Sequence, residues 1–178
     1  MKKLTLFVTL LLLTGCLGVP EGLTVIDNFE LSRYLGKWYE IARLDHSFER
    51  GLEQISAEYS MNPDGSVKVI NSGFKIETGE LDQAEGKAHF IDSPQKGSLK
   101  VSFFGPFYGS YNIIELDKEN YSYVMITGPN RDYFWILSRT PTLPQATLDK
   151  LIEKAKQLGF ATDQLIFANQ SPVAQKQK

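Results

Sequence analysis

The chain has 178 residues and a formal net charge of −2, and 42% of its residues are hydrophobic. This length suits one ordinary domain with a sizeable core, and a mildly acidic chain without a basic block argues against a nucleic-acid partner. Its one cysteine, Cys16, excludes an internal disulfide.

The N-terminus predicts an exported protein. Lys2 and Lys3 precede an apolar run at residues 4–13, which is too short to span a bilayer and is typical of a signal peptide. We therefore expect residues 1–15 to be removed. The end of this segment, Leu-Thr-Gly-Cys, resembles the bacterial lipobox, in which the cysteine is lipidated and begins the mature chain. The alternative is an ordinary signal peptide with a chance cysteine.

The lipobox predicts Cys16 as a lipidation site that carries palmitate or other acyl chains and anchors the protein to a membrane. Leu17 follows the cysteine, whereas Asp at that position retains similar lipoproteins in the inner membrane. We expect the outer membrane and its periplasmic face, although the residues themselves do not separate that face from the cell surface. Residues 16–30 are interpreted as an acylated N-terminus and tether, 31–170 as the folded domain and 171–178 as a flexible tail.

Residues 36–138 have the pattern of consecutive strands. Eight are expected, at 38–44, 54–60, 67–71, 85–91, 98–104, 110–116, 121–127 and 132–138. The turns between them are short, and Pro63, Asp64 and Gly65 make one of the strongest. Short sequential connections favour an antiparallel meander, and closure into a barrel rather than a sandwich removes the exposed edges. An eight-stranded barrel is just wide enough for one small ligand.

The hydrophobic period changes after residue 140. Leu143 and Pro144 open a predicted helix, and Gly159 is placed to end it. One apolar stripe runs along this helix, formed by Leu148, Leu151, Ile152, Ala155 and Leu158. We expect the stripe to pack on the outside of the barrel wall, followed by a short final strand at 165–167.

Three motifs carry a resemblance to a known family. Gly36 and Trp38 form a Gly-x-Trp motif at the first strand, residues 128–133 read Gly-Pro-Asn-Arg-Asp-Tyr before the last barrel strand, and Arg139 follows that strand. Over about residues 29–168 the chain resembles the lipocalins, and within them the bacterial outer-membrane lipoprotein lipocalins, which are similar to apolipoprotein D. The resemblance implies an all-β, eight-stranded antiparallel up-and-down barrel with a helix outside.

The resemblance also implies the residues that close the barrel. In lipocalins the tryptophan corresponding to Trp38 plugs one end, and the arginine corresponding to Arg139 lies over its ring as a cation–π pair. Gly36 is expected to let the incoming backbone approach closely.

The side chains that face the cavity depend on strand parity. In the last barrel strand, Tyr133 and Trp135 alternate with Phe134 and Ile136, and both faces are apolar enough that the pattern does not choose between them. Comparison with the family places Tyr133 and Trp135 inside. By the same comparison, the ligand lining also includes Ala57, Tyr59, Val69, Phe90, Val101, Phe103, Tyr111 and Ile113. The alternative is a dry core without a cavity.

Two acidic residues share the inward parity of their strands. Glu40 and Glu115 would then be buried carboxylates, and each would need a partner or would become neutral.

The loop after the first strand crowds Asp45, His46, Glu49 and Arg50 around Phe48. Such groups are capable of acid–base work, but we favour a solvated loop at the open end of the barrel, with Phe48 folded inward as part of a lid. The chain has no Gly-x-Ser-x-Gly motif, and its histidines lack a metal-ligand spacing. We therefore predict no enzyme, no cofactor and no metal site.

Three functions follow from these patterns. The first is binding, storage or transport of a fatty acid or lysophospholipid in the barrel at the outer membrane. The second keeps the barrel but binds a tetrapyrrole or another ring-shaped ligand. The third is an envelope protein that binds no ligand and contacts a partner through its loops, including residues 103–108. A homodimer is left open.

Overall fold

The computed structural model describes residues 17–171. The predicted signal peptide, the predicted lipidation site Cys16 and residues 172–178 lie outside the described residues.

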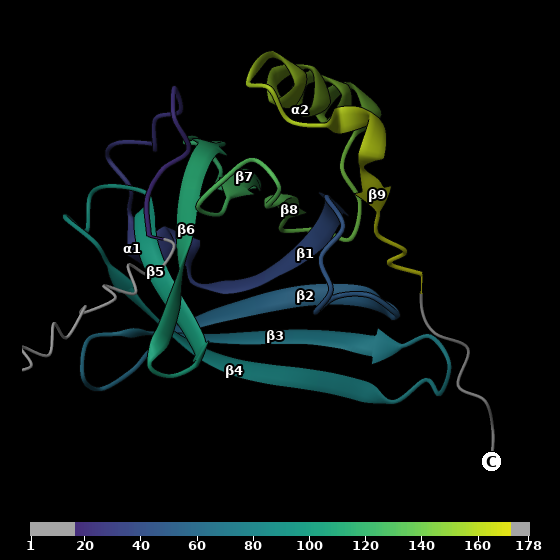
Figure 1. Cartoon of the computed structure of the whole chain (residues 1–178), viewed down its shortest axis with the longest axis horizontal. Helices are drawn as coiled ribbons and strands as arrows, with labels where there is room; N and C mark the ends of the chain where they lie inside the picture. The colour runs from purple at the N-terminus through teal and green to yellow at the C-terminus, as the bar shows by residue number, and fades with distance from the viewer. Residues whose placement is uncertain (1–16, 172–178) are drawn as a thin grey trace, which may run out of the picture.

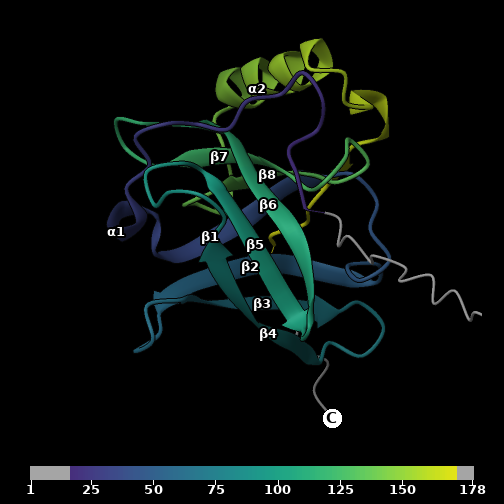
Figure 2. The same cartoon turned by 60° about the vertical axis from the view of Figure 1, so that its left-hand side comes forward.

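Eight strands form a closed antiparallel barrel, and a short ninth strand joins it (Figures 1 and 2). The barrel strands are β1 (Gly36–Arg43), β2 (Leu52–Met61), β3 (Val67–Lys75), β4 (Leu81–Phe90), β5 (Ser98–Phe104), β6 (Phe107–Leu116), β7 (Tyr123–Thr127) and β8 (Phe134–Ser138). The other elements are α1 (Leu31–Tyr34), α2 (Gln145–Gln157), the 3-10 turn η1 (Thr162–Gln164) and β9 (Ile166–Phe167). Every barrel strand pairs with its sequence neighbours, so the predicted up-and-down barrel is confirmed.

Strand β1 closes the barrel because it pairs on both sides. Tyr39 is opposite Ser138 of β8, and Trp38 is opposite Ala57 of β2. The register with β8 shifts between Glu40 and Ala42, which marks a β-bulge that bends the strand.

The C-terminal segment fills the gap where the second half of β1 separates from β2. β9 pairs with Ala42 and Arg43 of β1. Beyond it, the side-chain amide of Gln170 donates to the backbone oxygens of Glu40 at 2.7 Å and Ile55 at 2.8 Å. This segment therefore ties β1 to β2 beyond the last direct pair between them.

Two apolar cores lie on opposite sides of the barrel wall. The inner core contains Trp38, Tyr59 and Ile113. The outer core joins the buried face of α2, which includes Leu151, to Phe134 of β8, and α2 lies outside the barrel beside β7 and β8 in Figure 1. The predicted helix and its apolar stripe are thus observed on the outside of the wall.

The prediction that Glu115 points inward is wrong. Its carboxylate pairs with Lys154 of α2 on the outside of the barrel. The register between β6 and β7 shifts between Ile113 and Glu115, and this irregularity breaks the strict alternation on which the prediction depended.

Residues 17–30 lie against the barrel rather than forming a free tether. Asn112 Nδ2 donates to the Gly18 oxygen at 2.7 Å, and the Ile26 backbone bonds to Ile113 and Gly97. Phe29 is buried in the inner core. Ile26 packs against the same core, and Leu23 packs against the outer core.

Trp38 seals the closed end and has no exposed surface. Its indole Nε1 donates to the Tyr34 oxygen at 2.8 Å, and the Arg139 guanidinium lies 4.0 Å from the ring centroid. Arg139 also donates to the oxygens of Lys37 at 2.9 Å and Arg33 at 2.6 Å. Gly36 has a φ of +91°, a conformation that favours glycine.

We expect Arg139→Met to lower the free energy of unfolding by about 2–4 kcal/mol, because it removes a cation–π contact and charged hydrogen bonds from the closed end. Urea denaturation measures the loss. Arg50→Met is the control, since Arg50 makes only an exposed pair with Asp45 and its loss should be much smaller. Equal losses in the two variants would contradict this account of the closed end.

Candidate ligand-binding cavity

The interior of the barrel holds a cavity of about 840 Å³. Side chains from all eight barrel strands line it, together with residues of α1 and of the loop between β1 and β2. The cavity ends above the Trp38 plug and opens at the opposite end. Its volume lies within the usual range of pockets that bind small molecules.

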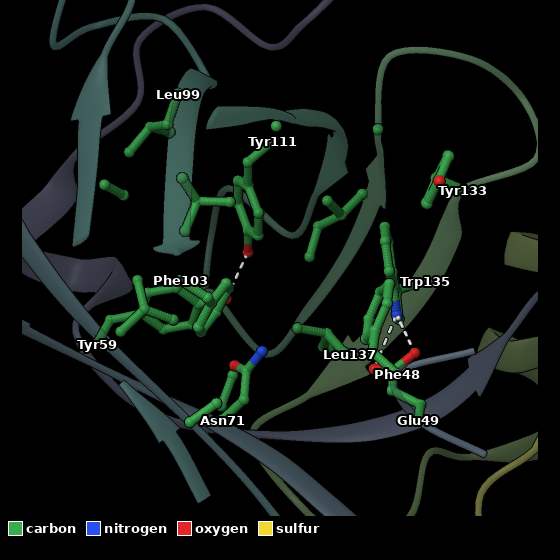
Figure 3. A pocket seen from close by; sticks show the side chains of 18 of the residues that line it. Phe48, Glu49, Tyr59, Asn71, Leu99, Phe103, Tyr111, Tyr133, Trp135 and Leu137 are labelled. Carbon is green, nitrogen blue, oxygen red and sulfur yellow. Dashed lines mark hydrogen bonds between the residues drawn. The ribbon is translucent and has the colours of Figure 1, made fainter. Parts of the chain in front are cut away.

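Most of the side chains predicted to face the ligand line this cavity. They are Phe48, Ala57, Tyr59, Val69, Val101, Phe103, Tyr111, Tyr133 and Trp135. Figure 3 shows several of them converging from different strands. Tyr133 and Trp135 face inward, whereas Phe134 and Ile136 belong to the outer core.

Phe90 and Ile113 belong to the inner core but do not line the cavity. Phe90 packs against Phe29, with ring centroids 6.0 Å apart, and Ile113 is fully buried and accepts a hydrogen bond from Ile26. The N-terminal segment covers both residues, so the cavity stops before it reaches them.

Three tyrosines form a polar cluster in the closed half of the cavity. The Tyr111 hydroxyl lies 2.6 Å from that of Tyr34 and 2.8 Å from that of Tyr59, and Figure 3 shows the contact with Tyr59. These contacts use two of the three hydroxyl protons, which leaves one donor for a polar group in the cavity.

Burial keeps these phenols neutral. It is the largest cause of the raised pKa of all three tyrosines, and it raises the pKa of Tyr59 to about 12. Neutral hydroxyls place hydrogen-bonding capacity deep in an otherwise mostly apolar cavity without placing a charge there.

A second polar group lies near the mouth. Glu49 lines the cavity and accepts a hydrogen bond from Trp135 Nε1 at 3.2 Å, as Figure 3 shows. Arg43 Nε lies 3.6 Å from the Glu49 carboxylate, and Arg43 Nη1 donates to Glu40 at 2.7 Å. Two carboxylates therefore share one guanidinium inside the barrel.

The bulge in β1 makes this arrangement possible. Trp38 and Glu40 face inward by ordinary alternation, and the extra residue Ile41 then lets Arg43 face inward as well. The partner of the buried Glu40 is thus a residue of its own strand.

The two carboxylates carry more negative charge than one guanidinium balances. Burial and the neighbouring Glu40 raise the pKa of Glu49 to about 8. Burial also raises the pKa of Glu40, although Arg43 opposes that shift. Because Glu40 is closer to the guanidinium, we assign the shared proton at neutral pH to Glu49.

The loop between β1 and β2 differs from the solvated loop that the sequence predicted. Asp45 and Arg50 form an exposed ion pair, as expected, but His46 and Glu49 are buried. His46 stacks between Phe48 and Tyr133, with centroids 5.3 and 5.1 Å away. Burial, with the nearby Arg43 charge, lowers the pKa of His46 to about 4, so this ring is uncharged at neutral pH.

Phe48 contributes to the mouth without closing it. Its ring lines the cavity, but 59% of the residue is exposed. It lies at the rim, 6.5 Å from the Trp135 ring, and is not folded inward as a lid.

Sequence reasoning missed several lining residues. Tyr34 precedes the Gly-x-Trp motif and lies in the four-residue helix α1, which carries no clear pattern. Asn71 of β3 places a polar side chain on the cavity wall. Strand alternation predicts that this side chain faces inward, but it does not indicate what the amide contributes there. The sequence marks Glu49 only as a charged residue of a loop.

Residues 17–171 contain neither a membrane-spanning helix nor a cluster of metal ligands. No helix in this part of the chain is long and apolar enough to cross a membrane. Within the same residues, no group of three or more His, Cys, Asp or Glu side chains is arranged to hold a metal ion.

Comparisons with known proteins agree with this architecture. The family model of the lipocalin-like domain matches residues 29–170. The outer membrane lipoprotein Blc of Vibrio cholerae is 55% identical over 170 residues, which cover 96% of this chain and 99% of that protein. The outer-membrane localisation that the sequence predicts is confirmed by this similarity.

More distant relatives share the same fold. Apolipoprotein D of Bos taurus is 37% identical over 156 residues, covering 78% of this chain and 81% of that protein. The structure of insecticyanin from the tobacco hornworm Manduca sexta superposes with a TM-score of 0.69 at 21% identity, covering 85% of this chain and 86% of that one. With its barrel, its cavity and these matches, the chain belongs to the lipocalin family, a family of ligand-binding and transport proteins.

Proposed function

We propose that the barrel binds one acyl-chain lipid, a fatty acid or a lysophospholipid, and stores or carries it at the outer membrane. One observation carries this proposal: a cavity of about 840 Å³ is sealed at one end, open at the other and lined mainly by apolar side chains. An acyl chain matches the apolar part of this wall. The polar groups near the mouth are suited to meet a headgroup.

Binding fits the side-chain chemistry better than catalysis does. Asp45 and Arg50 satisfy each other at the surface, and His46 is buried with Nε2 lacking a partner among the described residues. Glu49 accepts a hydrogen bond from the Trp135 indole. None of these groups is paired with a nucleophile that it could activate.

The second part of the proposal concerns the anchor. We infer that Cys16 carries the acyl chains that hold the mature protein on the membrane. Its support is the lipobox sequence together with the similarity to outer membrane lipoproteins. This places a lipid-binding barrel next to a source of lipid.

The first test is the response of tryptophan emission to a fatty acid. The mature chain from residue 16 with Cys16→Ser avoids the need for detergent. Palmitate should bind saturably and change the emission, because Trp135 lines the cavity whereas Trp38 is sealed at the closed end. Trp135→Phe should lose most of the response but keep binding, as measured by displacement of a fluorescent fatty acid.

An undiminished response in Trp135→Phe would contradict the placement of the ligand beside Trp135. If no acyl ligand binds saturably, the proposed function is wrong. Visible absorbance of the purified native protein would instead favour the ring-ligand alternative.

The second test shortens the cavity. Val69→Phe adds volume to the inner wall, so the chain of a long fatty acid should lose contact for its last methylenes. Since each buried methylene is worth about 0.8 kcal/mol, excluding two of them should weaken binding about tenfold. A shorter fatty acid should be affected much less.

Glu58→Phe is the matched control for Val69→Phe, because Glu58 is exposed on the outside of the neighbouring strand β2. Equal losses for short and long chains in Val69→Phe would argue against a chain that extends past this position.

The anchor is tested by fractionation of cells. Cys16→Ser, exported behind a signal peptide that is cleaved without a lipobox, should move the protein from the membrane fraction to the soluble fraction, because the acyl chains are then absent. Metabolic labelling with a palmitate analogue should mark the wild type and not the variant. Membrane retention of the variant would show that another feature holds the protein there.

A further inference from the structure

The wall of the cavity carries a polar group that no described side chain engages. Asn71 of β3 is half-buried and lines the cavity, and its side-chain amide makes no hydrogen bond to any described residue. Figure 3 shows this amide pointing from the wall into the cavity. An amide that is removed from water needs another hydrogen-bond partner. A ligand that displaces water from the cavity therefore has to supply one.

A second polar feature lies deeper in the same cavity. We call Tyr34, Tyr59 and Tyr111 the tyrosine cluster; all three line the cavity. Their three hydroxyls have six acceptor lone pairs, and the two contacts centred on Tyr111 occupy only two of them. The cluster is thus able to accept a hydrogen bond from a ligand, whichever way its own protons point.

Strand register sets the order of the two polar features along the wall. Tyr59 of β2 is directly opposite Val69 of β3. Asn71 is two residues nearer the end of β3 that lies beside the loop between β1 and β2, which is about 7 Å along the strand. A chain that enters at the mouth therefore reaches the level of Asn71 before that of the tyrosine cluster.

The charges around the cavity exclude an anionic group at this depth. None of the described residues that line it is Lys, Arg or His. The tyrosine hydroxyls are neutral, because burial raises the pKa of all three. An ionised carboxylate placed among them would lose its hydration without gaining a cation. The groups that fit are neutral and polar, and a hydroxyl fits best because it both donates and accepts.

We propose that Asn71 and the tyrosine cluster bind hydroxyl groups carried on the distal half of an acyl chain, so that the barrel accepts hydroxylated acyl lipids as well as plain ones. This inference rests on the proposed function, because it requires an acyl chain in the same cavity. A plain chain leaves the Asn71 amide without a partner. A hydroxyl beside either feature exchanges its bonds to water for bonds to the wall, which offsets the cost of its burial.

The test compares palmitate with 3-hydroxypalmitate, 12-hydroxypalmitate and 16-hydroxypalmitate. Each acid displaces a fluorescent fatty acid from the mature chain with Cys16→Ser, which gives its dissociation constant. The first hydroxyl stays beside the carboxylate at the mouth, so that acid is the control for position. In a wholly apolar wall, each of the two distal hydroxyls would weaken binding about tenfold, because it would lose its partners in water.

We expect the wild type to bind both distally hydroxylated acids at least as tightly as palmitate. Asn71→Leu keeps a similar size and breaks no hydrogen bond to a described residue, and it should weaken 12-hydroxypalmitate about tenfold relative to palmitate. Tyr59→Phe combined with Tyr111→Phe removes two hydroxyls of the cluster and should weaken 16-hydroxypalmitate by a similar factor. Affinity for palmitate and 3-hydroxypalmitate should change little, which also shows that each variant is folded.

Lys68→Leu is the matched control, since Lys68 lies on the same strand but pairs with Glu85 outside the cavity. It should leave all four affinities as they are in the wild type. The result with Asn71→Leu is decisive even if the double tyrosine variant does not fold.

Two results would overturn the inference and leave the proposed function intact. One is that both distally hydroxylated acids bind the wild type about tenfold or more weakly than palmitate does. The other is that Asn71→Leu leaves the affinity for 12-hydroxypalmitate relative to palmitate unchanged. If palmitate itself does not bind, the proposed function and the inference are both wrong.

Discussion

β1 is hydrogen-bonded to β8 along one edge and to β2 along the other, and the rest of the structure depends on this double pairing. It turns an open meander into a barrel and gives the sheet an inside and an outside. An open sheet would leave two edges unpaired. The inner and outer cores both need the closed wall, because each packs against one of its faces.

The same strand carries the plug and the charged group. Trp38 stands at its start and Arg43 at its end, so one continuous backbone joins the closed end to the mouth. The bulge at Ile41 allows this, because a regular strand would send the Arg43 side chain outward. Buried ions generally contribute little to stability.

The architecture could be predicted from the sequence because the hydrophobic period of strands and that of a helix occupy separate parts of the chain. Alternation over residues 36–138 predicts strands, and the stripe through Leu151 and Ala155 predicts a helix with one buried face. Short turns then leave few arrangements other than a meander. The position of the plug came from the resemblance to the family, not from any pattern of alternation.

The site was less accessible to the same reasoning. Strict parity failed for Glu115, because a bulge changes parity and leaves no mark in the sequence. The interior positions of Phe90 and Ile113 were implied by the resemblance to the family. The cavity does not reach them because residues 17–30, which have no hydrophobic period, cover them. The burial of Glu49 depends on Arg43 and Trp135 from different strands. A single sequence does not reveal such long-range contacts.

The attachment of Gly18 to the barrel has a consequence for geometry at the membrane. Its backbone is fixed on both sides, since its nitrogen donates to Ser110 Oγ at 2.7 Å and its oxygen accepts from Asn112. The proposed anchor at Cys16 is two residues away, a reach of about 7 Å at full extension. So short a connection leaves the barrel little of the rotational freedom that a long linker would give it. An anchor at Cys16 would therefore keep the side of the barrel at β6 next to the membrane.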